Sequence, residues 1–591
     1  MKPMNRKDTN IAFTWNLKDI FQSQEAFDKS YSEAKSDISN LRAYKETMLE
    51  NPERLKEALD FYYSLALRVE RIYIYAMLYK SEDNGNPSAQ ALEGRAINLY
   101  VEFKSASAFI EPIILSDREK LDEFLNSDLL RPYRRVLSEI KRGSDHILSE
   151  SEEEILSKLS DAASTPKNAF EMLESVDMVF DDTLGENGEK IPLSHGMYGV
   201  LIKSKNRDVR RAAFENYFGE FNKYINTFAA TYSGSVKTDA FYASVRKYNS
   251  SLEAGLFHAG VDTAVYKNLI SSIRNALPIM EKYIALRKEV LKLDDIATFD
   301  LYCPIADVPE IKLSYTEAER LVKEALKPLG KRYSELLDRA FSERWIDVYE
   351  NKGKTTGAFS CGLYSVHPYV LLNYTNTLDD AFTVAHELGH SMHSYFSDEA
   401  QDYQNSDYTI MAAEVASTVN EVLLTLYLLE NETDKQKRAW VLNHLLESFR
   451  TTVFRQTLFA EFEMKVHEAY ESGEPITAES LNSLYKSLNE EYYKGVKVSD
   501  LYSIEWARIP HFYNSFYVYQ YATGFCAAVA IARNILKTGD TTGYLDFLKT
   551  GGSDFPIEEL KLAGVDLSKP ETIENAMQLF EETIDELKNL L

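Results

Sequence analysis

The chain has 591 residues, of which 92 are acidic and 66 basic, so its formal net charge is −26. This excess of negative charge argues against nucleic acid or an anionic membrane surface as a partner. Its 3 cysteines (Cys303, Cys361 and Cys526) are too few and too widely spaced for a disulfide framework or a cysteine-type zinc site, and they fit a reducing cytoplasm.

The N-terminal third of the chain has the apolar spacing of successive helices. From about residue 24 to 175, apolar side chains recur at helical intervals, and the NGNP stretch at 84–87 separates two of these helices. The pair Asn187-Gly188 predicts a hairpin. The first residues have no apolar signal-peptide stretch, and no apolar run approaches ~18 residues, so we expect neither a secretion signal nor a transmembrane helix.

We place the main domain boundary near residue 200, with an N-terminal helical region at 1–200 and a second domain at 201–591. Within the second domain, a small extended element is predicted at 298–313. The residues from Thr316 to Glu319 then match a capping box, which predicts the start of another helix. The last helices of the chain carry Glu and Lys faces and run to the C-terminus.

Two short strands are predicted at 357–363 and 369–374, joined by a turn at His367-Pro368. An ordinary hairpin would have the same pattern. An extended peptide could nevertheless pair with an exposed strand edge here through main-chain hydrogen bonds. His367 is a candidate substrate contact at this place.

The stretch from His386 to His390 reads His-Glu-x-x-His, a two-histidine zinc signature with a general base between the ligands. A capping box at 377–380 and apolar residues at helical spacing predict a helix over 378–396. On that helix the two histidines lie one turn apart on the same face and can hold one zinc ion. Glu387 lies beside them and could accept a proton from water.

A third ligand is needed, and His393 is the first residue to consider. It lies seven residues after His386, or about 10 Å along the helix axis, which is too far for one ion with bonds of ~2 Å. We therefore interpret His393 as a supporting or structural residue. Asp398 and Glu399 are weaker alternatives because we expect them in a polar turn after the helix.

The residues at 408–430 predict a second, largely buried helix, and Glu414 and Glu421 lie seven apart near the same face of it. Two carboxylates in an apolar helix are costly unless they are paired or bind a metal. We predict Glu414 as the third zinc ligand. Glu421 is expected to orient a ligand histidine through a hydrogen bond.

With these motifs in place, the chain resembles the M3 peptidases, the thimet oligopeptidase group. HELGHSMH followed by AAEVASTVNE carries the resemblance, and Leu388 replaces a commoner phenylalanine. Four further stretches are similar to the oligoendopeptidase F branch: TWNLKDIF, GAFSCGLYSVHPYVLLNYT, IPHFYNSFYVYQYATG and GGSDFPIEELKLAGVDL. The resemblance covers nearly the whole chain.

The resemblance implies a zinc endopeptidase that hydrolyses internal bonds of short oligopeptides, with one Zn²⁺ per chain. The implied fold is mainly α, a large multi-helix two-lobed body with a deep substrate channel and a small β element next to the zinc helix. The region 1–200 would wall the channel, and 201–591 would form the catalytic domain. His386, His390 and Glu414 match the family's zinc-ligand positions, and Glu387 matches its catalytic glutamate.

The family also uses a C-terminal segment rich in His and Tyr to stabilise the transition state, and here it matches the stretch from His511 to Tyr521. Imidazole and phenol groups can donate hydrogen bonds to a tetrahedral oxyanion. We predict His511, Tyr517 and Tyr519 as catalytic. Tyr513 and Tyr521 crowd the same segment, so the choice among the tyrosines stays open.

Two other functions remain open from the sequence. One is a zinc exopeptidase of the same fold, a carboxypeptidase or dipeptidase that reads a free peptide terminus. The other is an acidic helical binding protein with a vestigial site. The cleavage preference, the maximum substrate length and the oligomeric state do not follow from the sequence.

Overall fold

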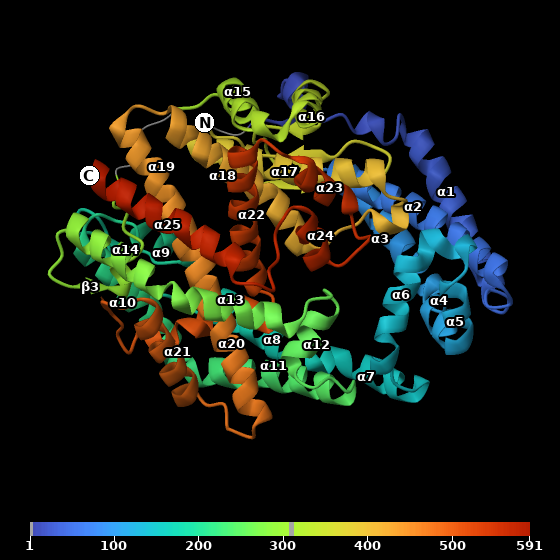
Figure 1. Ribbon diagram of the computed structural model, residues 1–591, viewed down its shortest axis with the longest axis horizontal. Helices are drawn as coiled ribbons and strands as arrows, with labels where there is room; N and C mark the ends of the chain where they lie inside the picture. The colour runs from blue at the N-terminus through green and yellow to red at the C-terminus, as the bar shows by residue number, and fades with distance from the viewer. Residues whose placement is uncertain (1–3, 307–311) are drawn as a thin grey trace. The chain divides into compact units, whose positions relative to one another are not determined.

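The computed structural model describes residues 4–306 and 312–591, and its secondary structure is mainly helical, as predicted. The chain forms two compact units, each assembled from segments far apart in the sequence. Unit 1 comprises Met1–Asp145, Ile311–Leu424 and Ile531–Gly564 (Figure 1). Unit 2 comprises His146–Glu310, Thr425–Ala530 and Val565–Leu591. The sequence boundary near residue 200 stays a prediction.

Unit 1 combines helices with one small sheet. Its helices are α1 (Gln24–Leu41), α2 (Pro52–Glu82), α3 (Pro87–Ser107), α4 (Ile110–Leu115), α5 (Arg118–Leu125), α6 (Arg134–Gly143), α15 (Tyr315–Ala325), α16 (Lys331–Ser342), α17 (Leu378–Ala400), the first part of α18 (Ile410–Asn431), the last part of α22 (Tyr519–Thr538), α23 (Thr542–Thr550) and α24 (Pro556–Leu562). Its strands are β4 (Ile346–Asp347), β5 (Phe359–Cys361) and β6 (Tyr369–Leu371).

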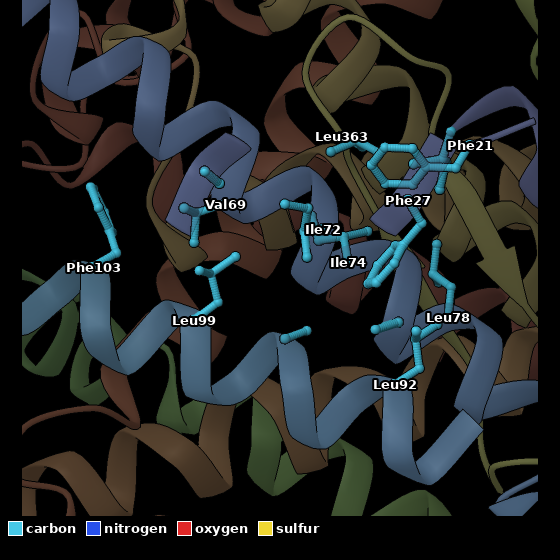
Figure 2. Packing of buried hydrophobic residues seen from close by; sticks show 14 of the residues in the cluster. Phe21, Phe27, Val69, Ile72, Ile74, Leu78, Leu92, Leu99, Phe103 and Leu363 are labelled. Atoms are coloured by element: carbon cyan, nitrogen blue, oxygen red, sulfur yellow. The ribbon is translucent and has the colours of Figure 1, made fainter. Parts of the chain in front are cut away.

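The long helices α2 and α3 pack side by side in unit 1 and build one of its cores. Figure 2 shows Leu99 of α3 pointing toward Val69 of α2, while Leu92 of α3 lies next to Leu78 of α2. The predicted break between the two helices is confirmed. The Asn86 side chain accepts hydrogen bonds from the backbone N–H groups of the first turn of α3, and the proline at position 87 starts that turn.

The three-stranded sheet has the order β4-β6-β5, with β4 parallel and β5 antiparallel to the central strand. Ser360 on β5 lies opposite Val370 on β6, so the predicted strand pair is confirmed. Within the described residues, β5 pairs with a strand on one side only. It is therefore the edge strand next to the signature helix α17.

Helix α17 begins where the sequence predicts. Thr377 and Asp380 form the capping box, with the Thr377 hydroxyl accepting from Asp380 N and the Asp380 carboxylate accepting from Thr377 N. The helix continues to Ala400, one turn beyond the predicted end. The prediction that Asp398 and Glu399 lie in a turn after the helix is therefore wrong, because both lie in its last turn.

The predicted cap at Thr316 and Glu319 is two residues late. Ser314 caps α15, and the Glu317 carboxylate accepts its backbone N–H at 2.9 Å. Two overlapping residue pairs, Ser314 with Glu317 and Thr316 with Glu319, match the capping-box pattern. The observed pair makes Tyr315 the first helical residue, and its ring is buried. The local sequence pattern alone could not choose between the two pairs.

Unit 2 is also mostly helical. Its helices are α7 (Glu150–Ala163), α8 (Thr165–Met172), α9 (His195–Leu201), α10 (Arg207–Lys223), α11 (Ile225–Val245), α12 (Ser251–Phe257), α13 (Thr263–Asn275), α14 (Leu277–Val290), the last part of α18, α19 (Lys435–Ser448), α20 (Arg455–Glu471), α21 (Ala478–Tyr492), the first part of α22, and α25 (Glu571–Leu590). Strands β1 (Thr183–Leu184) and β2 (Lys190–Ile191) form the predicted hairpin, with Gly188 at φ 84°. Strands β3 (Ile296–Ala297) and β7 (Val496–Lys497) pair in parallel. The predicted extended element at 298–313 partly overlaps a 3₁₀ turn at Thr298–Asp300, and its residues 307–311 lie outside the described part of the chain.

Helix α18 is, among the described residues, the one helix whose length and hydropathy would allow it to cross a membrane. Sequence analysis expected no transmembrane helix and predicted the segment at 408–430 as a largely buried helix. In the structure, 67% of its most apolar 18-residue window is buried inside the protein. It also carries polar residues such as Asn420, whose side chain donates to the Ala385 carbonyl of α17 at 2.9 Å. A core helix has these properties.

Candidate active site

The three predicted metal ligands converge in unit 1. His386 Nε2 lies 3.1 Å from His390 Nε2 on α17, and 3.8 Å from Oε2 of Glu414 on α18. One donor atom from each of the three residues lies within 4.8 Å of the other two, and all three side chains are half-buried. Two imidazoles and one carboxylate at this spacing could hold a small cation.

The approach of α17 to α18 brings these groups together. A Cβ atom on Gly389 would lie 2.4 Å from the Cα of Ser417 and 2.8 Å from the carbonyl oxygen of Ala416. Only glycine allows the two backbones to come this close. The glycine between the two histidines therefore places α18, with its carboxylates, against the histidine face of α17.

Glu421 orients the first histidine. Its Oε1 lies 2.5 Å from Nδ1 of His386, which leaves Nε2 directed toward His390 and Glu414. Burial lowers the pKa of His386, but the hydrogen bond and charge of Glu421 outweigh this effect and raise the pKa to about 9. A cation bound at Nε2 would compete with that proton.

His390 has the opposite electrostatic environment. Burial, together with the charge of His386, lowers the pKa of His390 to about 3, so its ring is neutral. The same ring donates to the backbone carbonyl of Ala413, one residue before Glu414. A neutral imidazole with one nitrogen held by a carbonyl can offer its other nitrogen as a ligand.

Glu387 lies next to the three ligands and is held by the edge strand. Its carboxylate accepts a hydrogen bond from the backbone N–H of Ser360 on β5. The side chain of the same serine lies 2.8 Å from the Ser391 hydroxyl of α17, so two contacts fix the strand to the helix. Burial raises the pKa of Glu387 to about 7, an effect that the positive charge of His386 opposes and the negative charge of Glu414 reinforces.

Sequence reasoning missed the Ser360 contact. It predicted a strand before the zinc helix, but no local pattern indicates that the backbone N–H of that strand would face a glutamate on the helix. A serine in the strand gave no signal either, because the contact to Glu387 uses the main chain.

Two other histidines lie away from the metal ligands. His393 is 1% exposed and its ring stacks on Tyr408 at a centroid distance of 3.7 Å, as expected of a structural residue. His367 Nδ1 lies 2.8 Å from the Pro368 carbonyl oxygen and its Nε2 lies 3.2 Å from Asp19. Both nitrogens of His367 thus have partners within unit 1.

A cavity of about 1040 Å³ borders His390 and Glu414 within unit 1. Its wall contains tyrosine rings from α2 and α3, and the carboxylates of Glu70, Asp398 and Asp407. This volume is at the upper end of the range for ligand pockets. Burial, with the charges of the two neighbouring carboxylates, raises the pKa of Asp398 to about 7.

The predicted His/Tyr segment lies in unit 2. Tyr521 Oη is 3.5 Å from His511 Nε2, and the ring of Tyr517 is parallel to that of His511 at 6.2 Å. The rings of Tyr517 and Tyr521 meet edge to face at 5.4 Å. Partial burial lowers the pKa of His511. These three residues form one cluster of hydrogen-bonding aromatic groups, which we call the His511 cluster.

The structure does not bring Tyr519 into the His511 cluster. Tyr519 is 1% exposed and its ring packs against Tyr266 at 5.2 Å, in the core of unit 2. Tyr513 also points elsewhere, with its hydroxyl 2.8 Å from that of Thr231. Positions 519 and 521 are only two apart at the start of α22, so the sequence could not tell which ring faces the histidine.

Comparison with known proteins identifies the family of the chain. The model of Peptidase family M3 matches residues 200–579, and that of Oligopeptidase F matches residues 113–180. The chain is a member of peptidase family M3. It is therefore a metallopeptidase of the oligoendopeptidase F type, as the motifs predicted.

Similar proteins match this chain over most or all of their length. Oligopeptidase PepF of Bacillus subtilis is 43% identical over 592 residues, covering 99% of this chain and 88% of the relative. The crystal structure of oligoendopeptidase-F from Enterococcus faecium is 36% identical with a TM-score of 0.72, covering 96% and 99% of the two chains. A crystal structure from Chlamydophila abortus is 35% identical with a TM-score of 0.94 and covers 100% of both chains.

Proposed function

We propose that this M3 metallopeptidase is a zinc-dependent endopeptidase that hydrolyses internal bonds of short oligopeptides. The observation that carries the proposal is the convergence of His386, His390 and Glu414 around one point, with Glu387 beside them. Two histidines and a glutamate are a donor set of catalytic zinc sites, and the hydrogen bond that His386 Nδ1 donates to Glu421 is the outer support such ligands need. A zinc ion held there would supply Lewis acidity and lower the pKa of water toward ~7.

Glu387 is the proposed general base and acid. Its carboxylate accepts a proton from the water that attacks the scissile carbonyl carbon, and then delivers that proton to the leaving amine nitrogen. The hydrogen bond from Ser360 N–H holds the carboxylate in a fixed orientation. The Glu387 carboxylate thus performs both proton transfers, from the water and to the amine.

Strand β5 is the proposed docking edge for the peptide. Because β5 pairs with β6 on one side only, the main-chain groups of its other edge that Glu387 does not occupy could accept an extended peptide through hydrogen bonds. Such pairing depends little on side chains, which suits an enzyme for varied oligopeptides. The N–H that Ser360 donates to Glu387 connects this strand to the general base.

The His511 cluster is the proposed source of oxyanion donors. An imidazole and phenol hydroxyls can donate to the oxygen that becomes negative in the tetrahedral intermediate, and removing one such donor costs about 10²–10³-fold in kcat. We favour Tyr521 and Tyr517 for this role. Tyr521 contacts His511, and the ring of Tyr517 packs against both residues. Tyr519, buried in the core of unit 2, is less suited to it.

The decisive experiment uses a quenched fluorescent peptide blocked at both ends, assayed with and without a chelator. An endopeptidase cleaves it, and chelation abolishes the cleavage until zinc is restored. A zinc exopeptidase would cleave only the unblocked peptide. A vestigial binding protein would cleave neither and would hold no stoichiometric zinc.

A further inference from the structure

Phe516 has an unusual backbone conformation directly before Tyr517. It lies in unit 2 between a 3₁₀ turn at Pro510–Tyr513 and the start of α22, with φ at 57°. A residue other than glycine rarely adopts this left-handed backbone conformation, because its Cβ atom crowds the backbone. Such strain persists only where surrounding contacts fix it, and it gathers at functional sites.

The backbone of Phe516 is held by a buried carboxyl group. The N–H of Phe516 donates to Oε1 of Glu463 on α20 at 2.9 Å. Glu463 is fully buried, and its Oε2 has no hydrogen-bond partner among the described residues. Burial raises the pKa of Glu463 to about 8, so the group is mostly neutral at pH 7. A buried carboxyl with a single partner is costly to keep, and that partner is the strained turn.

The ring of Phe516 is held independently of its backbone. It packs against His467 at 4.7 Å and against Tyr266 at 5.8 Å. Gly255 on α12 leaves room for it, because a Cβ atom there would lie 2.7 Å from Cδ2 of the ring. The ring therefore sits in a fitted pocket that includes His467, Tyr266 and Gly255.

The preceding residue is fixed as well. The Ser515 hydroxyl donates to Oδ2 of Asp239, and the same oxygen lies 3.2 Å from Nε2 of His467. The Nδ1 atom of His467 lies 2.9 Å from the Glu463 carbonyl oxygen, one turn earlier on α20. Helix α20 thus binds Phe516 directly through Glu463 and reaches Ser515 through Asp239 of α11.

We infer that Glu463 and His467 are positioning residues, which hold the turn at Ser515 and Phe516 so that Tyr517 and His511 keep the geometry of the His511 cluster. The inference rests on the proposed function of that cluster. Neither positioning residue contacts the cluster's hydrogen-bonding atoms in the structure. Glu463 acts through the backbone N–H of Phe516. His467 acts through the Phe516 ring and, by way of Asp239, through the Ser515 hydroxyl.

The test compares Glu463→Leu with Glu463→Gln in the full-length zinc-loaded enzyme, using the doubly blocked peptide. Leucine cannot accept the Phe516 N–H, whereas glutamine keeps a carbonyl oxygen at the same position and matches the neutral carboxyl. We expect Glu463→Leu to lower kcat by roughly 10–100-fold, since a displacement of ~1 Å can cost 10²-fold. KM and zinc content should stay near the wild-type values, and Glu463→Gln should restore most of kcat.

Glu461 provides a matched control on the same helix. It is also a buried carboxylate, but its partners are Arg274 and Tyr492, outside the 511–521 segment. Glu461→Leu should lower the thermal unfolding temperature and leave kcat of the folded enzyme unchanged. Gly255→Ala tests the ring pocket separately and should also lower kcat. It keeps the inference testable if Glu463→Leu fails to fold.

Several outcomes would overturn the inference: an unchanged kcat in Gly255→Ala or in folded Glu463→Leu, an equal loss in Glu461→Leu, or no recovery in Glu463→Gln. In each of these cases the wild-type enzyme still cleaves the blocked peptide, so the proposed function stands. If the wild-type enzyme itself fails to cleave the peptide, the proposed function and this inference are both overturned.

Discussion

Glu421 and His386 are joined by a hydrogen bond of 2.5 Å that determines which nitrogen of the imidazole faces the metal ligands. Replacing Glu421 by Ala removes this support, so we expect zinc affinity to fall by about 10–100-fold. Titration with zinc in a competing chelator buffer measures the change. Glu430→Ala, at an exposed position further along α18, should bind zinc like the wild-type enzyme. Equal affinity in the two variants would contradict the orienting role of Glu421.

Glu387 should be needed for turnover but not for metal binding. Glu387→Gln keeps the shape of the side chain and removes the base, so kcat should fall by about 10²–10⁴-fold while zinc content stays at one per chain. Steady-state kinetics and metal analysis on the same sample test both parts. Asp379→Asn, an exposed change in the first turn of α17, serves as the control with wild-type activity. Retained activity in Glu387→Gln would refute the mechanism.

Glu414 and His393 should respond differently to alanine substitution. Glu414→Ala removes a proposed ligand and should leave the purified protein with well under one zinc per chain. His393→Ala removes a buried ring that stacks on Tyr408, so it should keep its zinc and lose roughly 1–3 kcal/mol of stability. Metal analysis and urea unfolding distinguish the two effects. Loss of zinc in His393→Ala alone would assign the third ligand to the histidine.

Gly389 should tolerate no side chain. A methyl group would meet the backbone of α18 at 2.4 Å, so Gly389→Ala must push the helices apart. We expect a loss of about 1–3 kcal/mol and weaker zinc binding, because Glu414 and Glu421 would move with α18. Gly94→Ala on α3 is the matched control, since a Cβ there meets nothing within 4 Å. That variant should be neutral or slightly more stable, by up to ~1 kcal/mol.

Glu463 should make the stability of the protein depend on pH. Its pKa is about 8 in the folded protein and near 4.5 in an unfolded chain. Between pH 4.5 and pH 8 the folded state therefore binds a proton that the unfolded state has lost. Stability is therefore highest at low pH within this window and falls as pH rises toward 8, by up to a few kcal/mol. Glu463→Gln cannot ionise, so its unfolding temperature relative to wild type should rise from pH 5 to pH 8. A constant difference would contradict the raised pKa.

Local signals in the sequence predicted most of the elements around the site. A capping box uses only four consecutive residues, so the start of α17 at Thr377 follows from sequence alone. The same reasoning failed at Thr316, because two capping frames overlap there and the burial of Tyr315 decides between them. The end of α17 was also missed, since Asp398 and Glu399 are polar and yet helical.

Contacts between distant segments limited the prediction of the site. Helical spacing argued against His393 as a ligand and directed the search to Glu414, because on a rigid helix the number of residues between two positions fixes their distance along the axis. The role of Gly389 depends on α18, and the hydrogen bond to Glu387 depends on the backbone of Ser360. Likewise, only the packing at the start of α22 distinguishes Tyr521 from Tyr519.

The core between α2 and α3 also has a consequence for synthesis of the protein. Its buried cluster includes Phe27 and Ile72 from the N-terminal helices, but also Leu363 and Leu371 from the segment around the sheet. A ribosome that adds ~5–20 residues per second needs roughly 15–70 s to pass from the first group to the second. During that interval the N-terminal helices expose apolar surface that only later residues can cover. The nascent chain should therefore bind chaperones until the strand that contacts Glu387 has emerged.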